Sequence, residues 1–236
     1  MYGYGYGYYG FDWTYVLLII GMLLSLAAST RLKSTFSYYR KIRSASGLTG
    51  AETAERILRA AGITDVHVRA ISGSLTDHYD PRTKTVSLSE DIYDKTSLAA
   101  VGVAAHECGH AIQHAIGYAP LEFRSAIVPV ANFGSTLSWP LFLIGLFSGI
   151  RPLVTAGIVL FSLAVLFQLV TLPVEINASS IALKMLQSTG ILGSDETKGA
   201  RKVLTAAAMT YVAALAASIL QLLRLLILAG GRRRDD

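Results

Sequence analysis

The sequence predicts a mostly α-helical integral membrane protein, a bundle of about four membrane-spanning helices with a polar region that holds a small β-strand pair. The composition is the first reason, because 52% of the 236 residues are hydrophobic, only 16% are charged and the mean hydropathy is +0.46. These values are too apolar for an ordinary soluble domain. The second reason is that four apolar runs each approach the length of about 20 residues that a helix needs to cross the hydrocarbon core. The third is that basic residues cluster beside these runs, as in Arg31–Arg43.

The charge pattern and the cysteine content exclude several classes of protein. The net charge is +5, but the basic residues flank apolar runs, which is typical of membrane orientation signals. No basic stripe is interleaved with aromatic residues, so we expect no nucleic-acid partner. The single cysteine, Cys108, excludes an internal disulfide framework and a multi-cysteine zinc site. A transporter or channel is disfavoured because, apart from Arg224, ionisable residues are nearly absent from the apolar runs.

The apolar runs divide the chain into segments of alternating character. The expected segments are a Tyr/Gly-rich tail at 1–12, a first membrane helix at 13–29, a polar region at 31–125, a hairpin of two membrane helices at 126–173, a second polar segment at 174–203, a fourth membrane helix at 204–229 and a basic tail at 230–236. The Tyr/Gly-rich tail has no Lys or Arg and does not resemble a cleavable secretory signal.

Local signals predict the elements of the large polar region. Thr49, with Glu52 three residues later, is the pattern of a capping box at a helix start, and Gly62 ends the helix. Val66 and Val68 alternate with polar residues as in a short strand. A second strand is expected at 85–89, after a turn that contains Asp80-Pro81.

The next predicted helix carries the residues that point to chemistry. It begins at Thr96 or Ser97, both good N-cap residues, and ends near Ile116. His106 and His110 are four residues apart, so they lie on one face of the helix, where two imidazoles can bind one zinc ion. Glu107 is placed to accept a proton from a water molecule that the metal activates for attack on a carbonyl. This order of His, Glu and His predicts a zinc metalloprotease.

A catalytic zinc site needs a third protein ligand. His114 lies about 6 Å further along the same helix than His110 and cannot readily converge on the ion. Glu175 is the better candidate, because the helical hairpin returns it to the side of the membrane that holds His110. The other downstream acids either follow the helix too closely or lie in a solvated loop; they are Glu122, Asp195 and Glu196. Cys108 lies about 200° around the helix from His106 and should pack away from the metal.

Two stretches carry a resemblance to a known family. His106–Gln113 and Leu172–Ser179, supported by Leu75–Pro81 and Ala206–Ala213, resemble the bacterial membrane family of neutral zinc metallopeptidases of the YugP type. The resemblance implies a gluzincin-like HExxH catalytic region. It implies one zinc ion per chain, held by His106, His110 and Glu175, with Glu107 as the general base.

The sequence is also distantly similar to the HtpX and CAAX-type membrane metalloproteases. Their third-ligand motif ends in an Asp that would fall at Ser179, so Asn177 or Ser179 is expected to replace it in orienting a ligand histidine. Candidates for a donor to the transition-state oxyanion are His78, Tyr79 and Tyr118. By the same resemblance, the strand at 86–89 could be the edge that aligns an extended peptide.

We therefore expect a membrane-bound zinc endopeptidase that acts on accessible polypeptides, including membrane or misfolded proteins. The alternative is a non-proteolytic zinc-stabilised membrane scaffold, although a closed structural site would not need Glu107. The resemblance implies a multi-pass protein of the bacterial inner membrane, and the basic cluster Arg31–Arg43 predicts that its active site faces the cytoplasm. The basic tail does not fit four crossings, so either the last segment does not cross or the tail tolerates the outer side.

Overall fold

The computed structural model describes residues 12–231, so nearly all of the Tyr/Gly-rich tail and most of the basic tail lie outside the described residues. Within that range the protein has six helices and one sheet of three short strands. The described chain is therefore mostly helical, as the sequence predicts.

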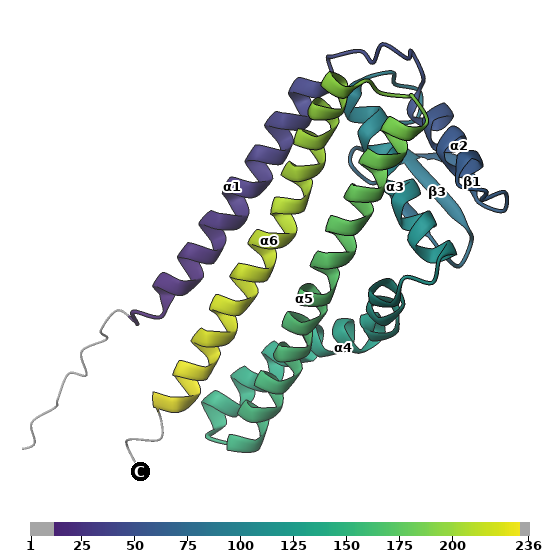
Figure 1. Ribbon diagram of the computed structural model, residues 1–236. Coiled ribbons are helices and arrows are strands. Elements are labelled where there is room, and N and C mark those ends of the chain that lie inside the picture. Colours follow the sequence, from purple (N-terminus) through teal and green to yellow (C-terminus); the bar gives the residue numbers. More distant parts are fainter. Residues whose placement is uncertain (1–11, 232–236) are drawn as a thin grey trace, which may run out of the picture.

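Four long helices form the body of the molecule (Figure 1). They are α1 (Tyr15–Tyr39), α4 (Ala119–Ser148), α5 (Arg151–Ser188) and α6 (Ser194–Gly231). Helix α1 lies along α6, and α4 and α5 form a hairpin that packs on α6 through α5. All four are long and apolar enough to cross a membrane, which confirms the predicted number of candidate spans.

Three of these helices are longer than the apolar runs that predicted them. Helix α1 continues through the basic cluster to Tyr39, and α5 runs without interruption from the third apolar run through Glu175 to Ser188. Helix α6 begins at Ser194, ten residues before the expected start at 204. The hydropathy marks where a helix leaves the apolar layer, but only turn and capping residues such as Gly190 mark where it ends.

The predicted capping signals are confirmed in the two shorter helices. In α2 (Gly50–Ala60) the backbone N–H of Glu52 donates to Thr49 Oγ1 at 3.1 Å, and the N–H of Thr49 donates to Glu52 Oε2 at 2.8 Å. In α3 (Leu98–Ala115) the N–H of Ala100 donates to Ser97 Oγ at 3.2 Å.

The sheet differs from the predicted strand pair. Its strands are β1 (His67–Ile71), β2 (His78–Asp80) and β3 (Thr85–Ser89), in the order β1-β3-β2. The sequence analysis missed β2, because three residues are too few to show an alternating pattern. It was also wrong to place an edge at 86–89, since β3 is the central strand, parallel to β1 and antiparallel to β2, and all its residues are buried.

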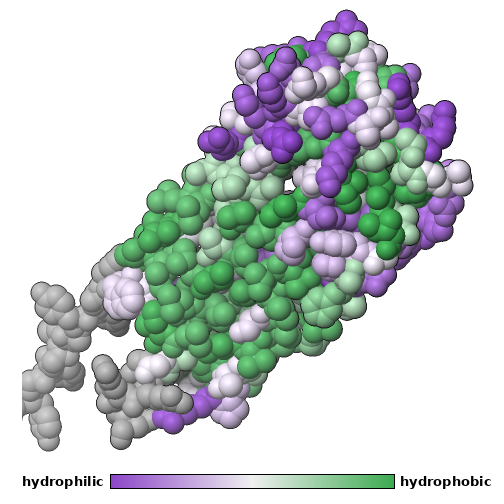
Figure 2. Space-filling model, viewed as in Figure 1, coloured by the Kyte–Doolittle hydropathy of each residue, from purple (hydrophilic) through white to green (hydrophobic). Residues whose placement is uncertain are grey.

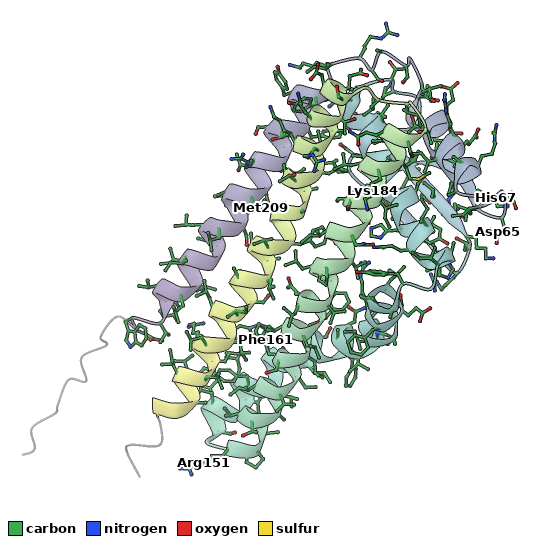
Figure 3. The ribbon with its side chains drawn as sticks, in the orientation of Figure 1. Asp65, His67, Arg151, Phe161, Lys184 and Met209 are labelled. Atoms are coloured by element: carbon green, nitrogen blue, oxygen red, sulfur yellow. The ribbon has the colours of Figure 1, made fainter. Side chains whose placement is uncertain are left out.

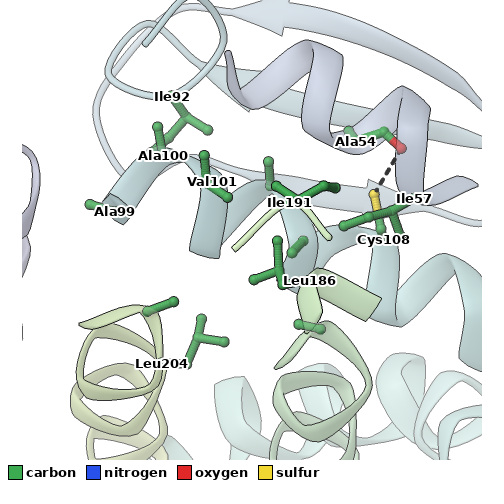
Figure 4. Close-up of a cluster of buried hydrophobic side chains, with 14 of the residues drawn as sticks. Ala54, Ile57, Ile92, Ala99, Ala100, Val101, Cys108, Leu186, Ile191 and Leu204 are labelled. Carbon is green, nitrogen blue, oxygen red and sulfur yellow. Dashed lines mark hydrogen bonds between the residues drawn. The ribbon is translucent and has the colours of Figure 1, made fainter. Parts of the chain in front are cut away.

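Helices α2 and α3, strand β3 and the polar ends of α5 and α6 share one apolar core (Figure 4). Cys108 lies inside it, fully buried, and its thiol donates to the backbone carbonyl of Ala54 at 3.5 Å. Ile57 of α2 and Leu186 of α5 are also fully buried in this core. The prediction that Cys108 packs away from the histidine face of its helix is confirmed.

The polar domain and the two ends of the described chain lie at opposite ends of the bundle (Figure 1). Figure 2 shows hydrophilic residues gathered over the domain and a hydrophobic surface over the body of the bundle. Arg151, the first residue of α5, lies at the end of the bundle opposite Lys184 (Figure 3). Near the C-terminal end of α6, Arg224 Nε donates to Thr14 Oγ1 at 3.3 Å, so α6 runs the whole length of the bundle beside α1.

The crossing of α3 over α5 is unusually close at Gly109. A Cβ atom on Gly109 would lie 2.5 Å from the backbone oxygen of Ala178. Gly102, two turns earlier in α3, has room by comparison, since its Cβ would meet only the Ala200 Cβ at 3.4 Å. The absence of a side chain at Gly109 therefore sets the distance between the two helices.

We predict that Gly109→Ala lowers stability whereas Gly102→Ala does not. Both substitutions gain helix propensity, up to about 1 kcal/mol, but only the first forces apart two packed backbones, at a cost of about 1–3 kcal/mol. The midpoints of thermal unfolding in detergent should separate the two variants. A Gly109→Ala midpoint at or above that of the wild type would contradict the close crossing.

Candidate metal centre

The crossing of α3 over α5 brings together three side chains that can bind a metal. His106 and His110 lie one turn apart on α3, and Glu175 of α5 faces both. Glu175 Oε2 lies 3.2 Å from His106 Nε2 and 3.6 Å from His110 Nε2. Each of the three residues offers one possible ligand atom, and these three atoms all lie within 4.8 Å of one another.

These donor atoms fit a zinc ion. Zinc bonds to imidazole nitrogen and carboxylate oxygen at about 2.0–2.2 Å in a tetrahedron, which places neighbouring ligand atoms about 3.3–3.6 Å apart. The two measured separations match this spacing. His106, His110 and Glu175 together would supply three of four positions, the number typical of a catalytic rather than a structural zinc site.

The hydrogen bonds of Gln113 fix the tautomer of His110. The Gln113 amide nitrogen Nε2 donates to the carbonyl of Val174 at 2.9 Å and to Asn177 Oδ1 at 2.8 Å. Its oxygen Oε1 therefore faces His110 Nδ1, 3.0 Å away. Because an amide oxygen only accepts, His110 Nδ1 carries the proton and the lone pair of Nε2 is free for a metal.

Ser179 orients the other histidine, but its hydroxyl can donate or accept and so does not by itself fix the tautomer. Its hydroxyl oxygen lies 3.1 Å from His106 Nδ1, on the side of the ring away from Glu175. Asn177 acts one step further out, because it accepts from Gln113 rather than from a histidine. The structure thus brings both residues that the sequence analysis proposed, Asn177 and Ser179, into the hydrogen bonding around the two imidazoles.

The second oxygen of Glu175 has a cationic neighbour. Arg124 of α4 places its NH1 atom 3.6 Å from Glu175 Oε1, while Oε2 faces the histidines. The Glu175 side chain is only 3% exposed, so this charge is compensated inside the protein. One oxygen of the Glu175 carboxylate therefore faces Arg124, and the other faces the metal position.

Glu107 lies beside the three donor residues without bonding to them. Its side chain is buried, and that burial raises the pKa of the Glu107 carboxyl above its ordinary value. His106 and His110 lower the pKa, but burial dominates. A carboxyl with a raised pKa takes up a proton more readily near neutral pH, which suits a general base that later returns the proton.

The other residues considered in the sequence analysis do not contact the three donor residues, although His78 and Tyr79 line a pocket beside them. Tyr79 Oη lies 2.9 Å from His114 Nδ1, so these two residues pair with each other. His78 Nδ1 lies 3.0 Å from the carbonyl of Thr76 on the exposed surface. Tyr118 is the N-cap of α4 and lines neither pocket around the histidines.

Two pockets open on either side of His106, Glu107 and Glu175. The first, of about 180 Å³, has apolar walls from α1 and α6, among them Leu32 and Leu204. The second, of about 290 Å³, reaches β2 and α4. Both pockets are also lined by Tyr211 of α6, so a chain passing from one to the other would cross the metal position.

Sequence reasoning missed three residues of this site. Gln113 could have been found, because it follows His110 by three residues and so lies one turn away on the same helix. Arg124 and Tyr211 gave no signal, since their place depends on how α4 and α6 pack against α3. Tyr211 lies close enough to Glu107 and Glu175 to interact with both carboxylates.

Comparison with known proteins agrees with this geometry. Residues 14–230 match the family described as "Putative neutral zinc metallopeptidase". The chain belongs to this family. It is 49% identical over 217 residues to the protein of Bacillus subtilis (strain 168) named "Putative membrane protease YugP", covering 92% of this chain and 96% of that protein. No solved structure matches the chain significantly. The family implies a zinc ion, for which the three donor residues form a candidate site.

We predict that Ser179→Ala weakens zinc binding about 10–100-fold, the usual effect of removing a hydrogen bond that orients a ligand histidine. The matched control is Ser180→Ala, which changes the next residue of the same helix, an exposed one. Zinc dissociation constants from competition with a chelator would measure the difference. Equal constants for wild type and Ser179→Ala would show that the hydroxyl does not orient His106.

Proposed function

We propose that the protein is a membrane-bound zinc endopeptidase that hydrolyses peptide bonds in polypeptides at the membrane surface. The observation that carries the proposal is the convergence of His106, His110 and Glu175 on one point, with the Glu107 carboxyl beside it and two pockets leading to it. The family and the relative in Bacillus subtilis support the same reaction class.

Each residue has a separate task in this mechanism. His106, His110 and Glu175 would hold one zinc ion, which when bound polarises a carbonyl and lowers the pKa of water. Glu107 takes a proton from the attacking water at its carboxylate and then gives it to the leaving amine. Burial around Glu107 keeps this proton from exchanging freely with solvent, since the side chain is almost inaccessible.

The negative charge that develops on the peptide oxygen needs a hydrogen-bond donor. We assign this task to Tyr211, which lines both pockets beside Glu107 and Glu175. Tyr79 is less suitable, because its hydroxyl is paired with His114. Arg124 lines only the second pocket.

We propose that an extended peptide aligns on β2 rather than on β3. One side of β2 pairs with β3, and no other strand of the described chain pairs with its second side. His78 and Tyr79 of β2 also line the second pocket, together with His106 and His110. Backbone hydrogen bonds along this free side would bind the substrate without strong sequence preference.

The scaffold alternative uses the same ligands but predicts no turnover. Within the described residues the candidate metal group contains three donors and leaves a fourth position open. A structural zinc ion is normally closed by four protein ligands. The open position and the neighbouring carboxyl of Glu107 therefore favour the enzyme.

We predict that Glu107→Gln abolishes proteolysis without loss of zinc. The amide cannot accept a proton, so cleavage of an unfolded protein substrate should fall by about 10²–10⁴-fold or more, while the zinc content stays at the wild-type value. Glu90→Gln, an exposed glutamate that lines neither pocket, is the matched control. His106→Ala should lose zinc and activity together.

The outcomes distinguish the endopeptidase from the non-proteolytic scaffold. Wild-type protein that binds zinc but cleaves none of the substrates tried would favour the scaffold. Equal cleavage by wild type and Glu107→Gln would remove the proposed general base. A wild-type protein without zinc would show that the ligand set is wrong.

We propose that the protein spans the bacterial inner membrane with the metal centre on the cytoplasmic side. Basic residues gather at the domain end of the bundle, from Arg31–Arg43 at the end of α1 and just after it to Arg201 and Lys202 on α6. The retention of positive charge in the cytoplasm orients such helices. The C-terminal end of α6 then lies on the outer side, because α6 runs the length of the bundle.

We predict opposite labelling of cysteines placed at the two ends. Native Cys108 is buried and should give little background. With a membrane-impermeant thiol reagent, Ser148→Cys at the end of α4 should react in spheroplasts, and Thr83→Cys in the polar domain only after the membrane is opened. The reverse pattern would place the metal centre outside the cytoplasm.

A further inference from the structure

A third pocket lies between α1 and α6 on the domain side of the bundle, apart from the two pockets at the metal centre. Its volume is about 420 Å³, and none of its lining residues is shared with the two pockets at the histidines. Its walls carry three basic side chains, Arg31, Arg201 and Lys202, together with the aliphatic hydroxyls of Ser34, Thr35 and Thr205 and the side chains of Tyr38 and Tyr39.

The charge of this pocket is uncompensated. No acidic residue lines it, and no described carboxylate forms an ion pair with Arg31, Arg201 or Lys202. Three cations around one cavity repel one another unless an anion lies between them. Within residues 12–231 the hydroxyls of Thr35 and Thr205 form no hydrogen bond, so they can donate to such an anion. Guanidinium, ammonium and hydroxyl donors in one cavity match the oxygens of a phosphate group.

The position of the pocket identifies the source of the phosphate. The apolar part of α1 ends at Ser29 and the predicted apolar part of α6 begins at 204, so the pocket lies where both helices leave the apolar layer. Two helical turns further into that layer, on the same faces as Arg31 and Lys202, lie Leu24 of α1 and Met209 of α6. These two side chains are 43% and 44% exposed. A phosphate in the pocket with acyl chains along these side chains fits a phospholipid, and the three basic side chains favour one whose headgroup carries a net negative charge.

We propose that this pocket binds the headgroup of an anionic phospholipid of the surrounding leaflet. The bound lipid bridges α1 and α6, because its phosphate contacts basic side chains of both helices. Other faces of the same two helices wall the first pocket at the metal centre, through Leu32 and Phe36 of α1 and Leu204 of α6. Lipid binding therefore stabilises the packing on which that wall depends, whether or not the metal centre is proteolytic.

The test compares neutralised variants of the whole protein in an uncharged detergent. The pocket variant combines Arg31→Gln, Arg201→Gln and Lys202→Gln. The control combines Lys33→Gln, Lys41→Gln and Arg59→Gln, which removes the same charge from exposed residues that do not line the pocket. Binding of phosphatidylglycerol is measured by native mass spectrometry and by the rise in the thermal unfolding midpoint, with phosphatidylcholine and inorganic phosphate as separate additions.

We expect one tightly bound phosphatidylglycerol per chain in the wild type and the control. The pocket variant should unfold at the wild-type midpoint without lipid, because its three residues are exposed, and should bind the lipid on the order of 100-fold more weakly, since each cation near an anionic surface contributes roughly fivefold. Equal weakening in the control would mean unspecific charge attraction and would overturn the site. Stabilisation by inorganic phosphate as strong as that by phosphatidylglycerol would mean a free-phosphate site instead, and unchanged binding in the pocket variant would refute the pocket altogether.

Discussion

The close contact between Gly109 of α3 and Ala178 of α5 determines the geometry of the metal centre. Gly109 precedes His110 and follows His106 by three residues, while Ala178 lies between Glu175 and Ser179. A methyl group at this point would push apart the backbones that carry all three donor residues. Since an imidazole and a carboxylate can share an ion only within about 3.3–3.6 Å of each other, a shift of even a few tenths of an ångström between the helices matters at the site.

The same crossing carries the hydrogen bonds that orient the ligands. Gln113 of α3 reaches Val174 and Asn177 of α5, and Ser179 of α5 reaches His106 of α3. These interactions link the two helices. Those of Gln113 also turn its amide oxygen toward His110 Nδ1, and Ser179 contacts His106 Nδ1 directly. A network of buried polar groups stabilises a structure when each group has a hydrogen-bond partner. Here the same contacts between α3 and α5 hold the helices together and orient the two imidazoles.

The sequence predicted the local features and the ligand set because both follow from short spacing or simple topology. His106 and His110 share a helical face by their spacing alone, and the predicted hairpin brought Glu175 back to the histidines. The capping box at Thr49 depends only on residues three apart. Strand β2 was missed because three residues are too few to show an alternating pattern, although it pairs with β3 across the short turn at 81–84.

Other failures came from using hydropathy to place boundaries. The expected division at 173–174 separated a membrane helix from a ligand segment, but α5 is one helix across that point. Arg124 and Tyr211 could not be found, because α4 and α6 are amphipathic only weakly and their sequences do not show which face meets α3. The long-range packing of these helices decides which of their polar residues reach the site.

The metal centre belongs to the membrane bundle as much as to the polar domain. His106, Glu107, His110 and Gln113 come from α3, whereas Glu175, Ser179, Arg124 and Tyr211 come from three helices long and apolar enough to cross a membrane. A rearrangement of α1, α5 or α6 within the bilayer would change the walls or the ligands of the site directly, without a separate hinge. The position of Glu107 relative to the three candidate ligands is therefore set by the packing of α3 against helices that are long and apolar enough to cross a membrane.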